Sequence, residues 1–303
     1  MSRHKDMGFT VLCLLPALLC IVFLFVYPVS RTVMMSFFTM STFMEGVGGW
    51  SFVGFDNYRN IFRMTIFTRS FRNLFLIWSV GGAFTLSVSL FYAVAISSGV
   101  KAKAFWRSIV YLPNIINMVA LATMWTQYIY SERFGLLTTV FGALGLETLA
   151  AVQWTGEHLI FWSMLFAFCL GCVGFFMLIF LAGIERIPAE LHESAYIEGA
   201  GRVRSFFLIT LPLLRGIIRT ALTLWTITTA NFFVWVMVIT RSINLSTVVP
   251  GVLMYNLVFG STDVGVGTMD PGAGAAVGVT VALAVMVAYT LLMLVFSERK
   301  VEY

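Results

Sequence analysis

Charge is scarce in this chain. Charged residues make up only 11% of its 303 residues, whereas apolar residues make up 59%; a typical soluble domain carries about 25% charged residues. The four cysteines all fall within apolar stretches, so a disulfide framework is excluded. An ordinary soluble domain is excluded as well, and the composition favours a bundle of helices within a membrane.

Sequence features that ATP binding, ion coupling or metal binding would need are also missing. None of the four lysines follows a glycine, so the chain has no Gly-x-x-x-x-Gly-Lys-Ser/Thr loop for ATP. The interiors of the long apolar stretches contain no Asp, Glu, Lys or Arg, which counts against an ion-coupled secondary transporter and against an embedded enzyme. Cys169 and Cys172 have no second pair or histidine cluster beside them, so packing explains them better than a metal. We expect no catalytic residue, no metal and no cofactor in this chain.

Six long apolar stretches predict the fold, because a spanning helix needs about 20 mostly apolar residues. They indicate an all-α polytopic membrane protein with one transmembrane domain of six helices. The expected spans are approximately 8–30, 73–98, 107–130, 158–183, 213–240 and 273–297. Two further stretches are rejected. Residues 134–146 are too short, and residues 242–262 contain Pro250 and several polar groups that lipid would leave unsatisfied, so an external loop or short surface helix is expected there.

Lysine and arginine decide the orientation, because loops on the cytoplasmic side carry an excess of both. With six spans and the N-terminus inside, twelve of the nineteen basic residues fall inside, including all four lysines. Seven fall outside, among them the cluster Arg59–Arg72, which is more basic than the rule favours. We expect both termini and residues 185–212 in the cytoplasm. This topology explains the net charge of +5 without nucleic acid as a partner.

The stretch 185–212 is polar and lies between two expected spans. Pro188 suits the start of a helix, and Gly199 or Gly201 suits its end, because glycine tolerates a left-handed backbone. A second short helix is expected over residues 202–208 and is stopped by the proline that ends the stretch. The predicted result is a helix–turn–helix on the cytoplasmic surface. Its expected contacts are the apolar Leu191, Ala195, Ile197 and Phe206 and the charged Glu193.

The spacing of this stretch resembles that of the EAA loop in ABC-transporter permease subunits, the loop that receives the ATPase. The fixed positions match, except that Ser194 stands where the family usually has Ala. The resemblance implies that the hairpin docks an ATPase; the alternative is an amphipathic hairpin that serves only the fold. The implied coupling residues are Glu193, Ser194, Ala195, Gly199, Ile209, Leu211 and Pro212.

Other segments resemble carbohydrate-importing permeases, in particular the first permease subunit of the maltose-importer type. Residues 52–58, Leu112-Pro113 and residues 134–136 are similar to segments of that family. Two positions depart from it. Residues 241–243 replace a usual Gly-Gly-Pro turn, and Gly174-Phe175 replaces a usual Pro-Phe pair, which puts the external loop and the shape of the substrate pocket in doubt.

The resemblance implies a subunit of an ATP-driven importer of a neutral carbohydrate in the cytoplasmic (inner) membrane. Its expected partners are a second permease subunit, two ATPase subunits that bind ATP and Mg, and an extracytoplasmic solute-binding protein. The alternatives are a secondary transporter or an importer of another polar solute such as glycerol phosphate. The absence of Arg from the interiors of the spans favours the neutral substrate.

Candidates for the substrate pathway are polar or aromatic residues at membrane depth, because uncharged sugars need a few polar groups in an apolar pocket. They are Asn117, Phe175, Trp225, Thr229 and Asn231. The resemblance implies a sixth candidate, Cys172, and also points to Phe175, Trp225 and Thr229. Trp225 and Thr229 are four residues apart and share a helix face, with Phe175 expected opposite them. Each candidate also suits helix packing alone.

Overall fold

The computed structural model describes residues 3–42, 44, 46–240, 244–260 and 269–296. The departure at residues 241–243 and the C-terminal residues 297–303 lie outside the described residues. The backbone divides into two compact units. The first comprises Met1–Phe67 with Leu253–Leu283, and the second comprises Thr68–Val252 with Ala284–Tyr303.

Among the described residues, five helical stretches are long and apolar enough to cross a membrane. They are Leu12–Met35, Thr65–Ser97, Ile160–Ile184, Arg215–Ile239 and Pro271–Val295. A sixth stretch consists of α6 (Lys103–Ile115) followed by Met118–Ile129, which is helix α7 (Met118–Met124) and the π-helical turn η4 (Trp125–Ile129). These two segments are bent by 98°. The expected third span at 107–130 is therefore not one straight helix.

The bend in the third stretch has a local cause. Pro113 lies in the last turn of α6, where it cannot donate a backbone hydrogen bond. Ile116 is extended (ψ 133°), and the Asn117 side chain accepts a hydrogen bond from the backbone N–H of Val119 at 2.9 Å, which caps α7. One helix thus ends and another begins within two residues.

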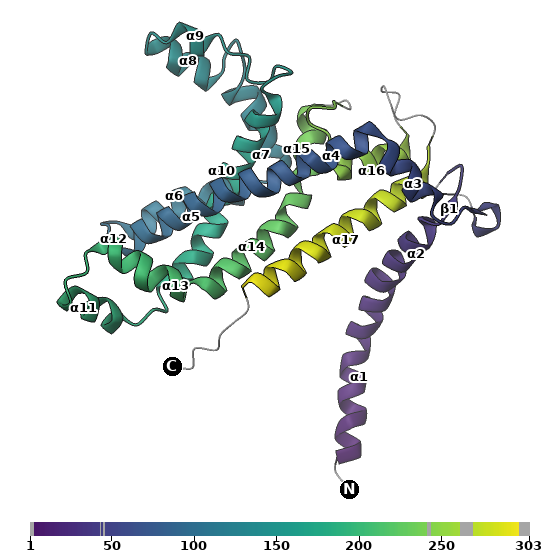
Figure 1. Ribbon diagram of the computed structural model, residues 1–303, viewed down its shortest axis with the longest axis horizontal. Helices are drawn as coiled ribbons and strands as arrows, with labels where there is room; N and C mark the ends of the chain where they lie inside the picture. The colour runs from purple at the N-terminus through teal and green to yellow at the C-terminus, as the bar shows by residue number, and fades with distance from the viewer. Residues whose placement is uncertain (1–2, 43, 45, 241–243, 261–268, 297–303) are drawn as a thin grey trace. The chain divides into compact units, whose positions relative to one another are not determined.

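The first unit begins with one long apolar helix, built from α1 (Arg3–Ile21), the π-helical turn η1 (Val22–Val26) and α2 (Tyr27–Met35) (Figure 1). A small antiparallel ribbon of strands β1 (Phe38–Thr39) and β2 (Ser51–Phe52) follows, with the 3-10 turn η2 (Val47–Gly49) between them. Phe38 lies opposite Phe52 in this ribbon. The sequence did not predict these strands, because two residues are too few to show a period.

Helix α3 (Asp56–Arg63) fastens the end of α2. The buried Asn57 side chain donates to the carbonyl oxygens of Ser36 (3.0 Å) and Phe38 (2.9 Å). The Tyr58 hydroxyl donates to the Ser36 hydroxyl at 2.7 Å, and Gly54 turns the chain with a left-handed φ of 57°. The segment 52–58, in which the family resemblance was found, therefore holds the chain at the end of α2 in place.

The rejected stretch 242–262 holds helix α16 (Pro250–Phe259), which is too short to span a membrane. It is not a free surface helix, because Leu253 and Leu257 are buried. Within the first unit, Gly274 of α17 (Pro271–Val295) lies so close to α16 that a Cβ would come within 2.7 Å of Val258. Small residues allow such close helix contacts.

The second unit is organised around α10 (Ile160–Ile184), of which 72% of the most apolar stretch is buried. It packs against α5 (Gly82–Ser97), α6 and α14 (Arg215–Ala230). Helix α4 (Thr65–Leu76) and the π-helical turn η3 (Ile77–Gly81) run directly into α5 (Figure 1). Helix α15 (Phe232–Ile239) continues α14, and its Phe232 ring meets that of Phe168 at 5.2 Å.

Two short helical pairs lie at opposite ends of α10 (Figure 1). Helices α8 (Leu136–Ala143) and α9 (Glu147–Ala150) precede its first residue. The rejected stretch 134–146 is thus a short helix and not a span. Helices α11 (Ala189–Ile197) and α12 (Arg202–Ser205) follow its last residue and occupy the predicted hairpin.

Candidate coupling hairpin and translocation pathway

The first arm of the hairpin, α11, ends at a left-handed glycine, as the sequence predicts for Gly199 or Gly201. Pro188 is the residue just before the helix, and Gly199 is left-handed with φ 81°. The backbone N–H of Gly199 donates to Tyr196 (3.0 Å) and that of Ala200 to Ala195 (2.8 Å), so the last carbonyl groups of α11 are satisfied. Gly201 keeps a φ of −66° and precedes α12. Gly199 therefore makes the turn between the arms.

The second arm is longer than predicted. Helix α12 runs on through the π-helical turn η5 (Phe206–Thr210) into α13 (Leu211–Leu213), and α14 starts directly afterwards. Pro212 does not stop the helix; it lies in α13, directly after the π-helical turn η5. His192 Nδ1 and Ser205 Oγ are 3.0 Å apart and join the two arms.

The coupling residues divide by exposure. Glu193, Ser194, Gly199 and Pro212 are exposed, Ile209 and Leu211 are half-buried, and Ala195 is buried. Ala195 was expected as a contact for a partner, but in this structure it packs within its own chain. Tyr196 (79% exposed), Ile197 (84%) and Val203 (73%) form the most open apolar surface instead. Tyr196 and Val203 were missed, although an apolar side chain among charged neighbours is the sequence signal that could have found them.

Trp225 is fully buried in the second unit. Its indole N–H donates to the carbonyl oxygen of Trp78 at 2.8 Å, and the indole N–H of Trp78 donates to the Thr226 hydroxyl at 2.9 Å. The Trp225 ring lies 5.8 Å from that of Phe168 and 5.9 Å from that of Phe176. In this conformation the indole has no face that a sugar can reach.

Two adjacent glycines make room for this indole. A Cβ on Gly82 would lie 2.5 Å from Trp225 Nε1, and a Cβ on Gly81 would lie 3.2 Å from the same ring and from Cys169 Sγ. Gly81 ends η3 and Gly82 begins α5, so the main chain of the second span passes directly over the tryptophan. Sequence reasoning missed both glycines, although a Gly-Gly pair inside an apolar span is a recognisable sign of close helix approach.

In the described part of the chain, the α10 rings that meet Trp225 belong to Phe168 and Phe176, whereas Phe175 was expected opposite it. Phe175 is about one-third exposed, and its ring contacts that of Phe176. Cys172, on the same helix, is buried. Thr229 is buried too, but it borders a cavity of about 530 Å³ in the second unit, together with Trp78 and Thr226.

The two asparagine candidates lie at helix breaks. Asn117 is exposed and caps α7, and Asn231 is exposed between α14 and α15. The structure brings Trp225 and Thr229 to one stretch of α14 but does not assemble all six candidates around one cavity. Their contact with a substrate remains a prediction.

Gly174, one of the two departures from the family pattern, has a structural reason. A Cβ there would lie 2.4 Å from the carbonyl oxygen of Val110 and 2.6 Å from the Cα of Tyr111. Helix α6 therefore crosses α10 backbone to backbone at this point. A larger residue at position 174 requires a different path for α6.

Comparison with known proteins places the chain in a family. Residues 85–303 match the family described as binding-protein-dependent transport system inner membrane component. The chain is 32% identical over 258 residues to the diacetylchitobiose uptake system permease protein NgcF of Streptomyces coelicolor, covering 81% of this chain and 71% of that protein. It is 31% identical over 288 residues to the alpha-glucoside transport system permease protein AglF of Rhizobium meliloti, covering 91% and 78%.

The fold has a solved counterpart. A chain from the crystal structure of a bacterial ABC transporter involved in the import of the acidic polysaccharide alginate superposes with a TM-score of 0.81 over 100% of both chains, at 20% sequence identity. The match to the family over residues 85–303 covers more than half of the chain. The apolar helices and the hairpin after α10 are consistent with a membrane component of a transport system. This chain belongs to the family of binding-protein-dependent transport system inner membrane components.

Proposed function

We propose that this chain forms part of the transmembrane pathway of an ATP-driven importer for a neutral sugar or oligosaccharide. A second permease subunit completes the pathway, two ATPase subunits bind ATP and Mg, and an extracytoplasmic solute-binding protein delivers the solute. The chain itself supplies no catalytic group. Its work is mechanical: the hairpin receives the movement of the ATPase and passes it to the spanning helices.

The observation that carries this proposal is the exposed hairpin. It presents the acidic Glu193 and the apolar Tyr196 and Ile197 on α11, and the apolar Val203 on α12, all exposed. Apolar residues with a charged neighbour suit a protein interface better than water. The second arm continues without a loop into α14. Movement of the hairpin is therefore transmitted to a spanning helix, α14, which carries Trp225 and Thr229.

The substrate class has two supports. The relatives NgcF and AglF are named for uptake of diacetylchitobiose and alpha-glucoside, and both names denote carbohydrates without charge. The five spanning stretches also offer no acidic or basic side chain in their middle portions to hold an ionised group. A phosphorylated solute such as glycerol phosphate then requires its charge to be met by another subunit.

The energy source is tested in proteoliposomes that contain the purified complex, enclosed ATP and an external binding protein loaded with a labelled oligosaccharide. Uptake should require ATP and be blocked by vanadate. An ion gradient alone should drive none. Uptake driven by the gradient without ATP makes the chain a secondary transporter and overturns the proposal.

The orientation that we propose has the hairpin and both termini in the cytoplasm. Single cysteines at Ser98, after α5, and at Ser51, in β2, test it in a background without the four native cysteines; both positions are exposed. In intact cells an impermeant thiol reagent should label position 51 and not position 98. The reverse labelling pattern would contradict the topology.

Coupling is tested by Glu193→Lys. Like charges brought together at a docking site cost several kcal/mol, so we expect transport and solute-stimulated ATP hydrolysis to fall about tenfold or more, while the permease still inserts. Glu190→Lys on the same exposed helix is the matched control and should act much less. Normal transport in Glu193→Lys, with normal assembly, would show that this loop is not the coupling element.

A further inference from the structure

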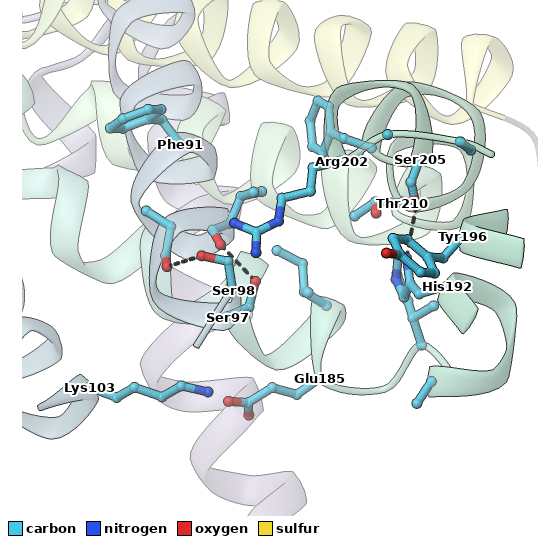
Figure 2. A pocket seen from close by; sticks show the side chains of 18 residues that line it. Phe91, Ser97, Ser98, Lys103, Glu185, His192, Tyr196, Arg202, Ser205 and Thr210 are labelled. Carbon is cyan, nitrogen blue, oxygen red and sulfur yellow. Dashed lines mark hydrogen bonds between the residues drawn. The ribbon is translucent and has the colours of Figure 1, made fainter. Parts of the chain in front are cut away.

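A cavity of about 890 Å³ lies behind the hairpin, within the second unit (Figure 2). It lies where α5 and α10 end and where the chain turns into α6 and into α11. None of the coupling residues implied by the sequence lines it. Of the residues of the proposed docking surface, Tyr196 also lines it, and docking of an ATPase there does not account for the rest of its wall.

The wall of the cavity is divided in two. Its apolar part comes mainly from the last turns of two spanning helices, with Phe91, Val94 and Ala95 on α5 and Ile184 on α10, and the hairpin adds Ile187 and Phe206. Its polar part comes from the helix ends and the hairpin, with Lys103, Glu185, His192 and Arg202 (Figure 2). Apolar side chains of two spanning helices and charged side chains of the helix ends and hairpin thus line one cavity.

The cationic side chains of the polar part have no partner among the residues that the structure describes. Neither Arg202 nor Lys103 takes part in an ion pair there, although Lys103 points towards Glu185 (Figure 2). The hydroxyls of Ser97 and Ser98 donate to the carbonyl oxygens of Val94 and Ala95 in their own helix. Arg202 and Lys103 are therefore two cationic donors that an anion could use, with Glu185 as an opposing charge and His192 held by Ser205.

We propose that this cavity binds an anionic phospholipid of the cytoplasmic leaflet. The lipid phosphate lies between Arg202 and Lys103, and the start of an acyl chain lies along Phe91, Val94 and Ala95. Basic residues next to a membrane attract anionic lipids, and the apolar wall continues from helices of the bilayer. A soluble phosphate would use the polar end alone and leave the apolar end facing water, which is unfavourable.

A phospholipid bound in the cavity would connect the spanning helices with the hairpin. It touches α5 on one side and the α11–α12 turn on the other, so a bound lipid fills the space between the spanning bundle and the hairpin. The choice of the cytoplasmic leaflet rests on the proposed orientation. The binding itself is measured without transport, so it can fail while the proposed function stands.

Three variants of the intact importer complex separate the parts of the site. Arg202→Gln removes the cation in the cavity, and Arg204→Gln removes an equally exposed cation of the same helix that does not line it. Ala95→Trp fills the apolar end without changing charge. Each detergent-purified complex is titrated with phosphatidylglycerol, phosphatidylcholine or inorganic phosphate, and retained lipid is counted by native mass spectrometry.

The wild-type complex should retain phosphatidylglycerol in preference to phosphatidylcholine. Arg202→Gln should weaken retention about fivefold, the change that corresponds to about 1 kcal/mol for one basic residue at a membrane surface. Ala95→Trp should weaken it too, and Arg204→Gln should leave it unchanged. Equal losses in Arg202→Gln and Arg204→Gln, or no preference for phosphatidylglycerol, would overturn the proposal. Undiminished retention in Ala95→Trp, with displacement by inorganic phosphate, would overturn it in favour of a soluble anion.

Discussion

Helix α10 and the helix Leu12–Met35 are almost equally hydrophobic and similar in length, yet they differ completely in burial. In α10, 72% of the most apolar stretch is buried, whereas in Leu12–Met35 the share is 0%. Hydrophobicity therefore sets which segments enter the membrane but not which ones pack inside the protein. Lipid chains are as apolar as leucine, so a buried position needs a further reason.

Small residues supply that reason. Helix α10 contains Gly171, Gly174 and Gly183, and at each a Cβ would lie within 3.0 Å of a neighbouring helix. The stretch Leu12–Met35 contains no glycine at all. Close backbone approach increases dispersion contacts, which drive helix association where the hydrophobic effect cannot. The first spanning helix keeps bulky side chains on every side and is fastened to its own unit at its end, through Asn57 and Tyr58.

The largest effect should follow from Trp225→Ala, because this side chain fills the centre of the packing around α10. Removal of a fully buried aromatic side chain costs about 3–5 kcal/mol, so the melting temperature of the purified complex should fall strongly. The control is Trp162→Ala, the same change at a half-exposed position of α10, with an expected cost of less than about 1 kcal/mol.

The same pair of variants distinguishes packing from substrate contact. If Trp225→Ala leaves the melting temperature unchanged and alters only which oligosaccharide is transported, the indole faces the pathway in another conformation of the importer. Packing in the present conformation would then be incidental.

A smaller loss should follow from Gly174→Ala. The added Cβ meets backbone atoms of Val110 and Tyr111, and backbone cannot rotate out of the way as a side chain can. Overpacking of this kind costs about 1–3 kcal/mol. Gly216→Ala on α14 is the matched control, because a Cβ added there would have no heavy atom of a neighbouring element within 4 Å in the part of the chain that the structure describes. Thermal unfolding of both complexes measures the difference; equal stability would mean that α6 moves freely against α10.

The sequence predicted what depends on composition and on single local rules. Charge-free stretches predicted the helical membrane fold, and the turn that ends α11 was predicted at Gly199 or Gly201, of which the structure uses Gly199. The family resemblance rested on the spacing around Glu193. Each of these follows from a short segment read by itself.

Features that depend on a neighbour were not predicted. The break at Asn117 required weighing Pro113 and an asparagine cap together within an apolar stretch that looked continuous. The burial of Trp225 depends on Gly81 and Gly82, which lie more than a hundred residues away along the chain. Phe175 is partly exposed and Phe176 is buried, although the two are adjacent on α10. The rotation of the helix about its axis decides which of them faces the protein, and an all-apolar helix has no polar face from which this rotation can be predicted.

The smallest effect is expected for Leu19→Ala in the first spanning helix. Leu19 is about half exposed, so its removal leaves no cavity within this chain and should cost less than about 1 kcal/mol. Leu165→Ala on α10 is the matched change at a buried leucine, where about 2–5 kcal/mol is expected. Both are measured by thermal unfolding of the full importer complex in detergent. If Leu19→Ala destabilises the complex as much as Leu165→Ala, another subunit buries this helix, and the contrast with α10 belongs to the single chain and not to the assembled importer.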